Sequence, residues 1–277
     1  MNVLARLTVR GRLLAHVADS NLPTKPPVAE TVSENEVAGL PAPAQRYLRF
    51  MGVMGHPRDW SFRICFRGAF RLREGSPWTS CVAWQYNTSH PVCRIFGMRV
   101  NIAKIVPLFG TDIYLGGHGR MRGKLLGIVP VVNESGRELD LGELVTYLND
   151  ACLIAPSMLL DPAVTWSAAG DDTFAVTLTD AGNSVTAQIR IDADGRLIEF
   201  GTTDRWYTGP SGLVRTLWTT PAQGWEIHDG RPFPTALSAI WHPAGRDHEY
   251  IRGRFLPQTA EFNLPARIDI GAEPAAA

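Results

Sequence analysis

The fold is decided by residues 164–201, which read VTWSAAGDDTFAVTLTDAGNSVTAQIRIDADGRLIEFG. Short runs rich in β-branched residues alternate here with turn residues. The runs cover residues 164–168, 173–179, 184–191 and 196–201. The last turn, Asp194-Gly195, suits a hairpin because both of its central residues must tolerate positive φ. The segment therefore predicts an antiparallel meander of four strands.

The same pattern continues on both sides of the meander. Apolar side chains occupy every second position of residues 60–66, which is typical of a half-buried strand. Further strands are expected at residues 78–86, 92–102, 112–115, 118–126, 213–219, 223–228, 235–241 and 249–256. So many antiparallel strands avoid long exposed edges by curving toward closure. The sequence predicts a mainly β protein of the α+β class, whose strongly curved antiparallel sheet forms a barrel or half-barrel.

Two helices are expected among the strands. Residues 42–51 carry apolar side chains at helical spacing and end at Gly52. A longer helix is expected from about Asp140, because Asp140 and Glu143 match a capping box and the apolar residues that follow share one face. This mid-chain helix is predicted to cover or plug one opening of the barrel.

Composition and charge exclude several classes of protein. The chain has 277 residues, with 27 Lys+Arg against 27 Asp+Glu, so its formal net charge is zero. A neutral chain has no overall field to attract nucleic acid, and no nucleic-acid partner is expected. No run approaches the roughly 18 apolar residues of a membrane-spanning helix, so no transmembrane segment is expected either.

The N-terminal region is expected to be separate from the sheet. Residues 1–22 carry arginines that interrupt every apolar run, which favours a short amphipathic helix over a secretory signal. Such a helix packs on its own domain or makes a weak contact with a membrane surface, and the first reading is favoured. Five prolines within residues 21–43 indicate a linker. The predicted division is residues 1–40 for helix and linker, 41–258 for the ligand-enclosing domain, and 259–277 for a C-terminal tail.

The spacing of the cysteines indicates the cellular compartment of the protein. Cys65, Cys81, Cys93 and Cys152 lie far apart and form no C-x-x-C pair. Neither a disulfide framework nor a zinc site is indicated, so reduced, packed thiols are expected. Together with the missing signal, this predicts a cytoplasmic location.

Three stretches resemble one known family. They are LPAPAQRYL at residues 40–48, GRMR at 119–122 with LLGIVPVV at 125–132, and LVTYLNDACLIAPSMLLDP at 144–162 followed by Trp166. Together they are similar to an uncharacterised domain-of-unknown-function family of actinobacteria. No catalytic residue is assigned in that family, so the resemblance transfers none. It implies a fold similar to the half-barrels of LolA- and LppX-type lipid carriers, although no signal peptide or lipobox is recognised in this chain.

Motifs for metal, nucleotide or covalent chemistry are missing. The closest metal candidate joins His242 to Asp247, His248 and Glu249, but its spacer Pro243-Ala244-Gly245 favours a solvated turn. Residues 116–119 are glycine-rich, yet they join two strands and open no helix that could cradle a phosphate. No G-x-S-x-G elbow occurs. No metal and no cofactor are therefore expected.

Basic residues recur at strand spacing. One set is Arg63, Arg67, Arg71 and Arg73, and another is Arg120, Arg122 and Lys124. Such spacing places the residues of each set on one face of a strand. A solvated outer face is the favoured reading, and an anionic ligand or a membrane headgroup is the alternative.

The aromatic residues point to a binding cavity. Eight tryptophans lie in or beside expected strands, and alternate positions of a closed sheet face its lumen. The predicted ligand-binding residues are Trp84, Trp206, Trp218, Trp225 and Trp241. The predicted acid–base residues, polar groups on strands near these tryptophans, are Tyr86, Asp204, Glu226 and His242. Asp204 with Arg205 is also compatible with a structural ion pair, and the tryptophans with simple core packing.

Two functions from different classes follow, both with an apolar small molecule as partner. By elimination, the favoured one is a cofactor-independent cyclase or isomerase that folds its substrate in the lumen with limited acid–base help. The alternative is a carrier or sensor that encloses a lipid or another hydrophobic ligand without chemistry. A third reading, an interaction module, requires a lumen filled by side chains.

Overall fold

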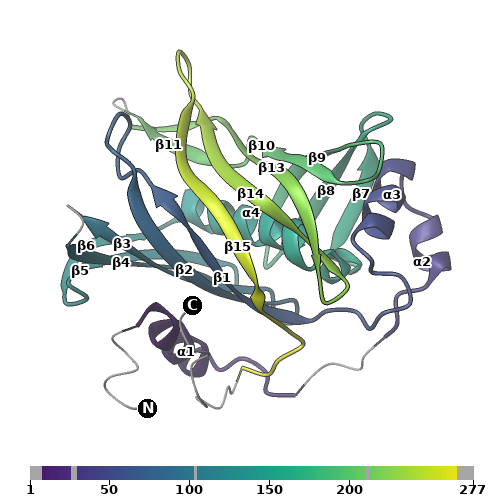
Figure 1. Ribbon diagram of the computed structural model, residues 1–277, viewed down its shortest axis with the longest axis horizontal. Helices are drawn as coiled ribbons and strands as arrows, with labels where there is room; N and C mark the ends of the chain where they lie inside the picture. Colours follow the sequence, from purple (N-terminus) through teal and green to yellow (C-terminus); the bar gives the residue numbers. More distant parts are fainter. Residues whose placement is uncertain (1–7, 26–29, 103–104, 210–211, 267–277) are drawn as a thin grey trace.

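A computed structural model describes residues 8–25, 30–102, 105–209 and 212–266 of the chain. Its main element is an antiparallel sheet of 13 strands, bent into an open half-barrel (Figure 1). The strands of this sheet are β1 (Ser61–Phe70), β2 (Thr79–Thr88), β3 (Cys93–Ile102), β4 (Val106–Leu115), β5 (His118–Leu125), β6 (Val129–Ser135), β7 (Val164–Ala168), β8 (Thr173–Asp180), β9 (Asn183–Ile191), β10 (Leu197–Thr202), β13 (Leu217–His228), β14 (Arg231–His242) and β15 (His248–Phe262). A separate hairpin joins β11 (Trp206–Gly209) to β12 (Gly212–Arg215). The helices are α1 (Val9–Asp19), α2 (Glu34–Ala38), α3 (Ala42–Phe50) and α4 (Arg137–Ile154), with a 3-10 turn, η2, at Pro156–Leu159.

The order of strands makes the curved sheet an open one. It runs β6-β5-β4-β3-β2-β1-β15-β14-β13-β10-β9-β8-β7, so β6 and β7 are its two edges and do not pair. The chain leaves the edge at β6, passes through α4 on the concave side, and re-enters the sheet at β7 (Figure 1). The predicted mainly β, curved antiparallel sheet with a covering mid-chain helix is confirmed, as a half-barrel and not as a closed barrel.

Helix α4 lies in the concavity and is buried on most of its surface. Twelve of its 18 residues are buried, including the charged Glu143 and Asp150. The predicted capping box at its start is wrong. The helix begins three residues earlier, after Gly136, and Asp140 accepts a hydrogen bond from the Gly119 N–H at 2.7 Å. Both carboxylates of the proposed box are used by tertiary contacts, because the strands β3 and β5 present donors to them.

Helix α1 packs against the convex face of the sheet. Its Leu13 and Val17 are each only 1% exposed and join a cluster with Tyr86 and Ile95 on β2 and β3. The apolar side of this helix therefore binds its own domain, as the favoured reading of the N-terminal region states. That side is not available for the weak membrane contact considered for residues 1–22.

The C-terminal limit of the domain lies further along the chain than expected. Strand β15 continues to Phe262, four residues beyond the predicted end at residue 258, because its last residues pair with the start of β1. Phe262 pairs with Phe62, and Glu261 forms an ion pair with the buried Arg63. Within the described part of the chain, no helix combines the length and the apolar character needed to cross a bilayer.

Candidate functional site

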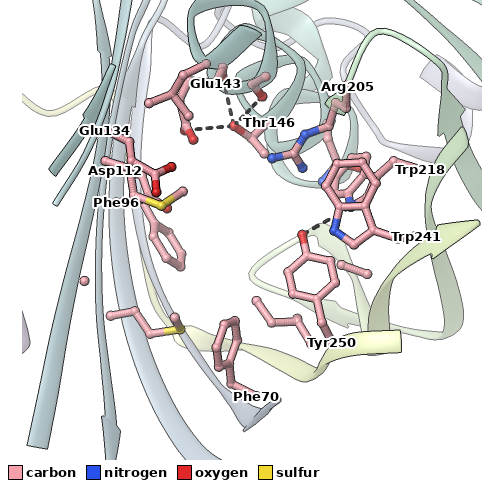
Figure 2. A pocket seen from close by; sticks show the side chains of 18 of the residues that line it. Phe70, Phe96, Asp112, Glu134, Glu143, Thr146, Arg205, Trp218, Trp241 and Tyr250 are labelled. Carbon is pink, nitrogen blue, oxygen red and sulfur yellow. Dashed lines mark hydrogen bonds between the residues drawn. The ribbon is translucent and has the colours of Figure 1, made fainter. Parts of the chain in front are cut away.

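A cavity of about 930 Å³ lies between the concave face of the sheet and α4 (Figure 2). Small-molecule sites usually enclose ~300–1,000 Å³, so this volume accommodates a sizeable ligand. Leu72, after β1, and Leu213, on β12, both line the cavity and face solvent, at 43% and 57% exposed. These two residues therefore stand at its mouth. The lumen is open, which counts against the interaction-module reading.

One wall is built by a row of residues across neighbouring strands. Gln85, Phe96, Asp112, Met121 and Glu134 are successive cross-strand partners on β2 to β6, and all five line the cavity. Directly opposed residues on antiparallel strands point to the same face. The row therefore lays a strip of mixed apolar and acidic character along the wall.

The facing wall is aromatic and carries one arginine. Trp218 donates a hydrogen bond from Nε1 to the Tyr250 hydroxyl at 3.1 Å, and Trp241 stacks on the same tyrosine with ring centroids 6.3 Å apart. The Arg205 guanidinium carbon lies 4.4 Å from the ring centroid of Trp218 and 5.2 Å from that of Trp241. Figure 2 shows this guanidinium pointing from the aromatic wall into the cavity. Gly142 of α4 lies beside it, and a Cβ at Gly142 would make an ordinary van der Waals contact of 3.8 Å with Arg205 Nε.

The end of the cavity beside α4 is charged. Arg94 on β3 donates from Nε to Asp150 at 2.7 Å and from Nη1 to Glu143 at 3.0 Å. All three side chains are at least nine-tenths buried. Burial alone would lower the pKa of Arg94, but Asp150 and Glu143 raise it above its ordinary value. This triad is a satisfied structural network that joins α4 to the sheet.

Asp112 is one of several titratable groups that line the cavity, with Glu134 and His248 among the others. Burial raises the pKa of Asp112 to about 7, with a further contribution from Glu143, while Arg94 and Arg205 act in the opposite direction. The carboxyl lies on the row opposite the aromatic wall (Figure 2). It therefore changes its charge near neutral pH inside an apolar cavity.

Several buried hydrogen-bond donors of cavity-lining residues, Arg71 Nε among them, have no acceptor among the described residues. Arg205 Nη1 and Gln85 Nε2 are buried and lie within hydrogen-bond distance of no acceptor among the described residues. The Gln85 side chain is only 3% exposed. A buried donor left unpaired costs ~1–3 kcal/mol, so both favour a ligand that brings acceptor atoms.

The cavity presents no metal site. Among the described residues, no three His, Cys, Asp or Glu side chains gather closely enough to hold an ion. His242 contacts Asp247 at 2.8 Å through Nδ1 and the Thr219 hydroxyl at 2.9 Å through Nε2. Its neighbours are thus a strand hydroxyl and a loop carboxylate. All four cysteines are buried thiols without a disulfide.

The sequence places this half-barrel and its cavity in a family. The pattern of a family described as a family of unknown function (DUF6544) matches residues 30–253, most of the chain. The chain belongs to the DUF6544 family. The resemblance read from residues 40–241 is thereby confirmed. A comparison of this DUF6544 chain with curated proteins finds none that matches it.

Solved structures with a similar outline include two bacterial proteins. A LolA superfamily protein from Nitrosomonas europaea aligns over 80% of this chain and 91% of its own, at 11% identity and a TM-score of 0.37. A putative outer membrane lipoprotein-sorting protein domain from Vibrio parahaemolyticus aligns over 77% and 87%, at 10% identity and a TM-score of 0.35. Likeness this distant says nothing about the ligand of the DUF6544 chain.

The structure brings three of the five predicted ligand-binding tryptophans together. Trp206, Trp218 and Trp241 line the cavity of the DUF6544 chain. Trp84 does not, because it lies on the convex side of β2, where Arg10 of α1 approaches its ring. Trp225 lies further along β13 and packs edge-on against Phe50 of α3, with centroids 5.3 Å apart.

None of the four predicted acid–base residues lines the cavity. Tyr86 points to the convex side and donates its hydroxyl to the Leu264 carbonyl at 3.0 Å, and burial raises its pKa. Glu226 is exposed near the β13–β14 turn. Asp204 accepts a hydrogen bond from the Thr186 N–H at 2.8 Å.

The expected Asp204–Arg205 ion pair is also wrong. Asp204 pairs with Arg215 of β12, across the base of the β11–β12 hairpin. Arg205 points the other way, into the cavity, where its guanidinium lies against the rings of Trp218 and Trp241. Its guanidinium has no carboxylate within 4.0 Å among the described residues.

The residues that form the polar end were missed by the sequence reasoning. Glu143 was assigned to a helix cap, and Arg94, Asp112 and Asp150 were not singled out. One signal was available, since Asp150 lies in an otherwise apolar stretch of α4, where a charge requires a buried partner. The identity of that partner depends on the strand pairing and could not be read from the chain.

Proposed function

We propose that this protein encloses an elongated apolar molecule with hydrogen-bond acceptors at one end, and carries or senses it without changing it. The observation that carries the proposal is the open cavity of about 930 Å³, with an aromatic wall and a polar end. Apolar pockets with a few placed polar groups are typical of small-molecule sites. The carrier is favoured over the cyclase or isomerase because the four residues expected to supply acid–base chemistry lie outside the cavity.

The polar end indicates the chemistry of the ligand head. Arg94 is already paired with two carboxylates, so it does not attract a ligand anion of its own. Arg205 lines the cavity without a carboxylate partner, and its buried Nη1 has no acceptor among the described residues. A carbonyl or carboxylate placed between Arg205 and Asp112 would satisfy this donor. A protonated Asp112 would in turn donate to the same group.

Binding can be tested with brominated lipids. Trp206, Trp218 and Trp241 line the cavity, so a brominated fatty acid seated there should quench tryptophan fluorescence. We expect saturable quenching, which the unbrominated acid reverses by competition. An Arg205→Leu variant should bind the acid roughly tenfold more weakly, because a charge-assisted hydrogen bond is lost.

The matched controls separate the head group from the tail. The corresponding alkane should compete only weakly with wild type and should be unaffected by Arg205→Leu. Arg215→Leu removes an arginine of the neighbouring hairpin that does not line the cavity, and it should leave binding unchanged. Absence of saturable quenching by wild type would overturn the proposal.

A cofactor-independent cyclase or isomerase is the second candidate, and one observation supports it. Asp112 faces the cavity and has a pKa of about 7, a value suited to a general acid or base. The discriminating measurement is mass spectrometry of ligand captured from a metabolite extract and then released. A ligand returned unaltered supports the carrier, and one altered by wild type but not by Asp112→Asn supports the enzyme. The cytoplasmic location stays a prediction.

A further inference from the structure

The pairing of the strands places several turns on one rim of the half-barrel. Phe70, at the end of β1, pairs with Ile251 of β15, so the β1–β2 and β14–β15 loops lie at the same end of the sheet. The β3–β4 and β5–β6 turns follow at that end, because each strand from β1 to β6 pairs antiparallel with the next. Figure 1 shows these loops and the β11–β12 hairpin on one side of the molecule. The cavity opens there, between Leu72 and Leu213.

Exposed apolar side chains gather on this rim. Of the ten large apolar side chains exposed among the described residues, nine lie there: Leu72, Ile105, Leu126, Ile128, Val129, Val131, Leu213, Val214 and Leu217. The most exposed are Ile105 at 80% and Ile128 at 74%. The tenth, Ile227, is 66% exposed and lies at the opposite end, in the β13–β14 turn. Scattered apolar residues are ordinary on a protein surface, but a group on one rim marks an interaction site.

The β5–β6 turn departs from ordinary turn chemistry. Leu126 and Gly127 both have positive φ, 53° and 76°, and they are two of the three residues that connect Leu125 of β5 to Val129 of β6. Among non-glycine residues, Asn and Asp are the ones that most often adopt positive φ, and a leucine there is strained. The leucine is also 55% exposed, so it gains little from packing within the protein. Folding alone therefore does not account for an apolar side chain at this tip.

Cations stand directly behind these turns, on the convex face. Arg99 and Lys124 flank Phe109 in one cross-strand row, and the Arg12 guanidinium carbon of α1 lies 4.2 Å from the centroid of the Phe109 ring. Arg122 lies on the same face of β5 as Lys124, and we call these four the basic collar. None of them has a carboxylate within 4.0 Å among the described residues. Burial lowers the pKa of the neighbouring His16. Asp19 acts in the opposite direction, and the charges of Arg122, Lys124 and Arg12 lower this pKa further.

We propose that this rim docks on an anionic phospholipid bilayer. The apolar turns enter the boundary between headgroups and acyl chains, and the basic collar faces the lipid phosphates. Membrane-surface binding combines buried apolar area with attraction between basic side chains and anionic lipids, and both parts occur here. Docking in this orientation turns the mouth of the cavity toward the lipid.

The charges argue against a second copy of the chain as the occupant. In a symmetric dimer formed through this rim, the basic collar of one chain would lie near the basic collar of the other. The like charges of the two collars would repel each other. A bilayer instead supplies the opposite charge across the whole rim. In this orientation, Arg12 is the residue of α1 that faces the membrane. The apolar side of the helix stays buried on the sheet.

The test is vesicle flotation with paired isoleucine variants. Full-length wild type should float with vesicles of phosphatidylcholine and phosphatidylglycerol, less with phosphatidylcholine alone, and less as salt increases. The double variant Ile105→Ser/Ile128→Ser should lower the partition coefficient by roughly tenfold or more, because two exposed side chains no longer enter the bilayer. The control Ile227→Ser removes an equally apolar, exposed side chain from the opposite end and should bind as wild type does.

A second variant tests the charges. Arg99→Ala/Lys124→Ala should reduce binding to anionic vesicles and leave binding to phosphatidylcholine unchanged. Neither Ile105 nor Ile128 lines the cavity, so the isoleucine variants should keep the quenching by brominated fatty acid in solution. That separates loss of docking from loss of ligand binding. The proposal is overturned if wild type does not float, if Ile227→Ser is as defective as the double variant, or if light scattering shows a dimer that Ile105→Ser/Ile128→Ser dissociates.

Discussion

Replacing Asp112 by asparagine is expected to stabilise the protein, and increasingly so as the pH rises. Burial raises the pKa of this carboxyl from its ordinary value of 3.8 to about 7, with Glu143 adding to the effect and Arg94 and Arg205 opposing it. A carboxyl whose pKa is raised by folding lowers the stability of the folded state once it ionises. Its contribution to stability is therefore present below about pH 4 and is lost progressively as the pH rises through 7.

The size of the effect follows from the two pKa values. Ionising a carboxyl that folding holds at a pKa of about 7 costs about 4 kcal/mol at high pH, and about 3 kcal/mol of this develops between pH 5 and pH 8. Asparagine has nearly the same shape and cannot ionise. The free energy of unfolding of Asp112→Asn minus that of wild type should thus grow by about 3 kcal/mol over this interval.

The assay is urea unfolding of both proteins at several pH values, followed by tryptophan fluorescence. The difference between the two proteins cancels the titration of other groups. Asp171→Asn, at an exposed position, controls for the loss of one negative charge. If the stability difference for Asp112→Asn stays constant from pH 5 to pH 8, or falls, Asp112 is not a desolvated carboxyl and the account of the polar end fails.

Four further outcomes are expected. Arg94→Met should lower the free energy of unfolding by about 3–5 kcal/mol near neutral pH, because two buried carboxylates of α4 lose their cation. Urea unfolding measures this loss, which should be smaller at low pH. Gly68→Ala should cost ~1–3 kcal/mol, since its Cβ would meet the backbone of β15, whereas Gly110→Ala, with nothing within 4 Å of its Cβ, serves as the control. Leu13→Ala should release α1 and cost ~2–4 kcal/mol, seen as faster amide exchange in that helix. A fatty acid should bind more weakly above pH 7 than below it, and Asp112→Asn should abolish this dependence, as competition assays would show.

Much of the fold could be predicted because it depends on residue alternation and turn residues within short segments of the sequence. The alternation of residues 60–66 and the turn residues near Asp194-Gly195 identify antiparallel strands without any knowledge of their partners. The predicted two-residue turn itself is wrong, because only Gly195 has positive φ and Ile191 pairs with Leu197. The edge strand β6 was not predicted, because its proline and exposed valines lack the alternation of a half-buried strand.

The candidate site was harder to predict, since it depends on which face of each strand points inward. Trp84 and Gln85 are neighbours on β2, and the inward position belongs to the glutamine. Favouring tryptophans as cavity residues therefore selects the wrong member of this pair. Likewise, Arg205 lines the cavity and its neighbour Asp204 does not, which the sequence does not show.

What the sequence determined by itself is the class of the protein: a mainly β chain with curved antiparallel strands, one mid-chain helix and enough aromatic residues for a binding wall. Periodicity and turn chemistry are properties of short segments, so they survive without tertiary information. Only the tertiary structure decided the rest. Burial on β4, together with Glu143 of α4, raises the pKa of Asp112 to about 7, and Arg94 is held by Asp150 and Glu143 from a helix more than forty residues away. Burial and charge pairing act between segments that the chain brings together only when it folds.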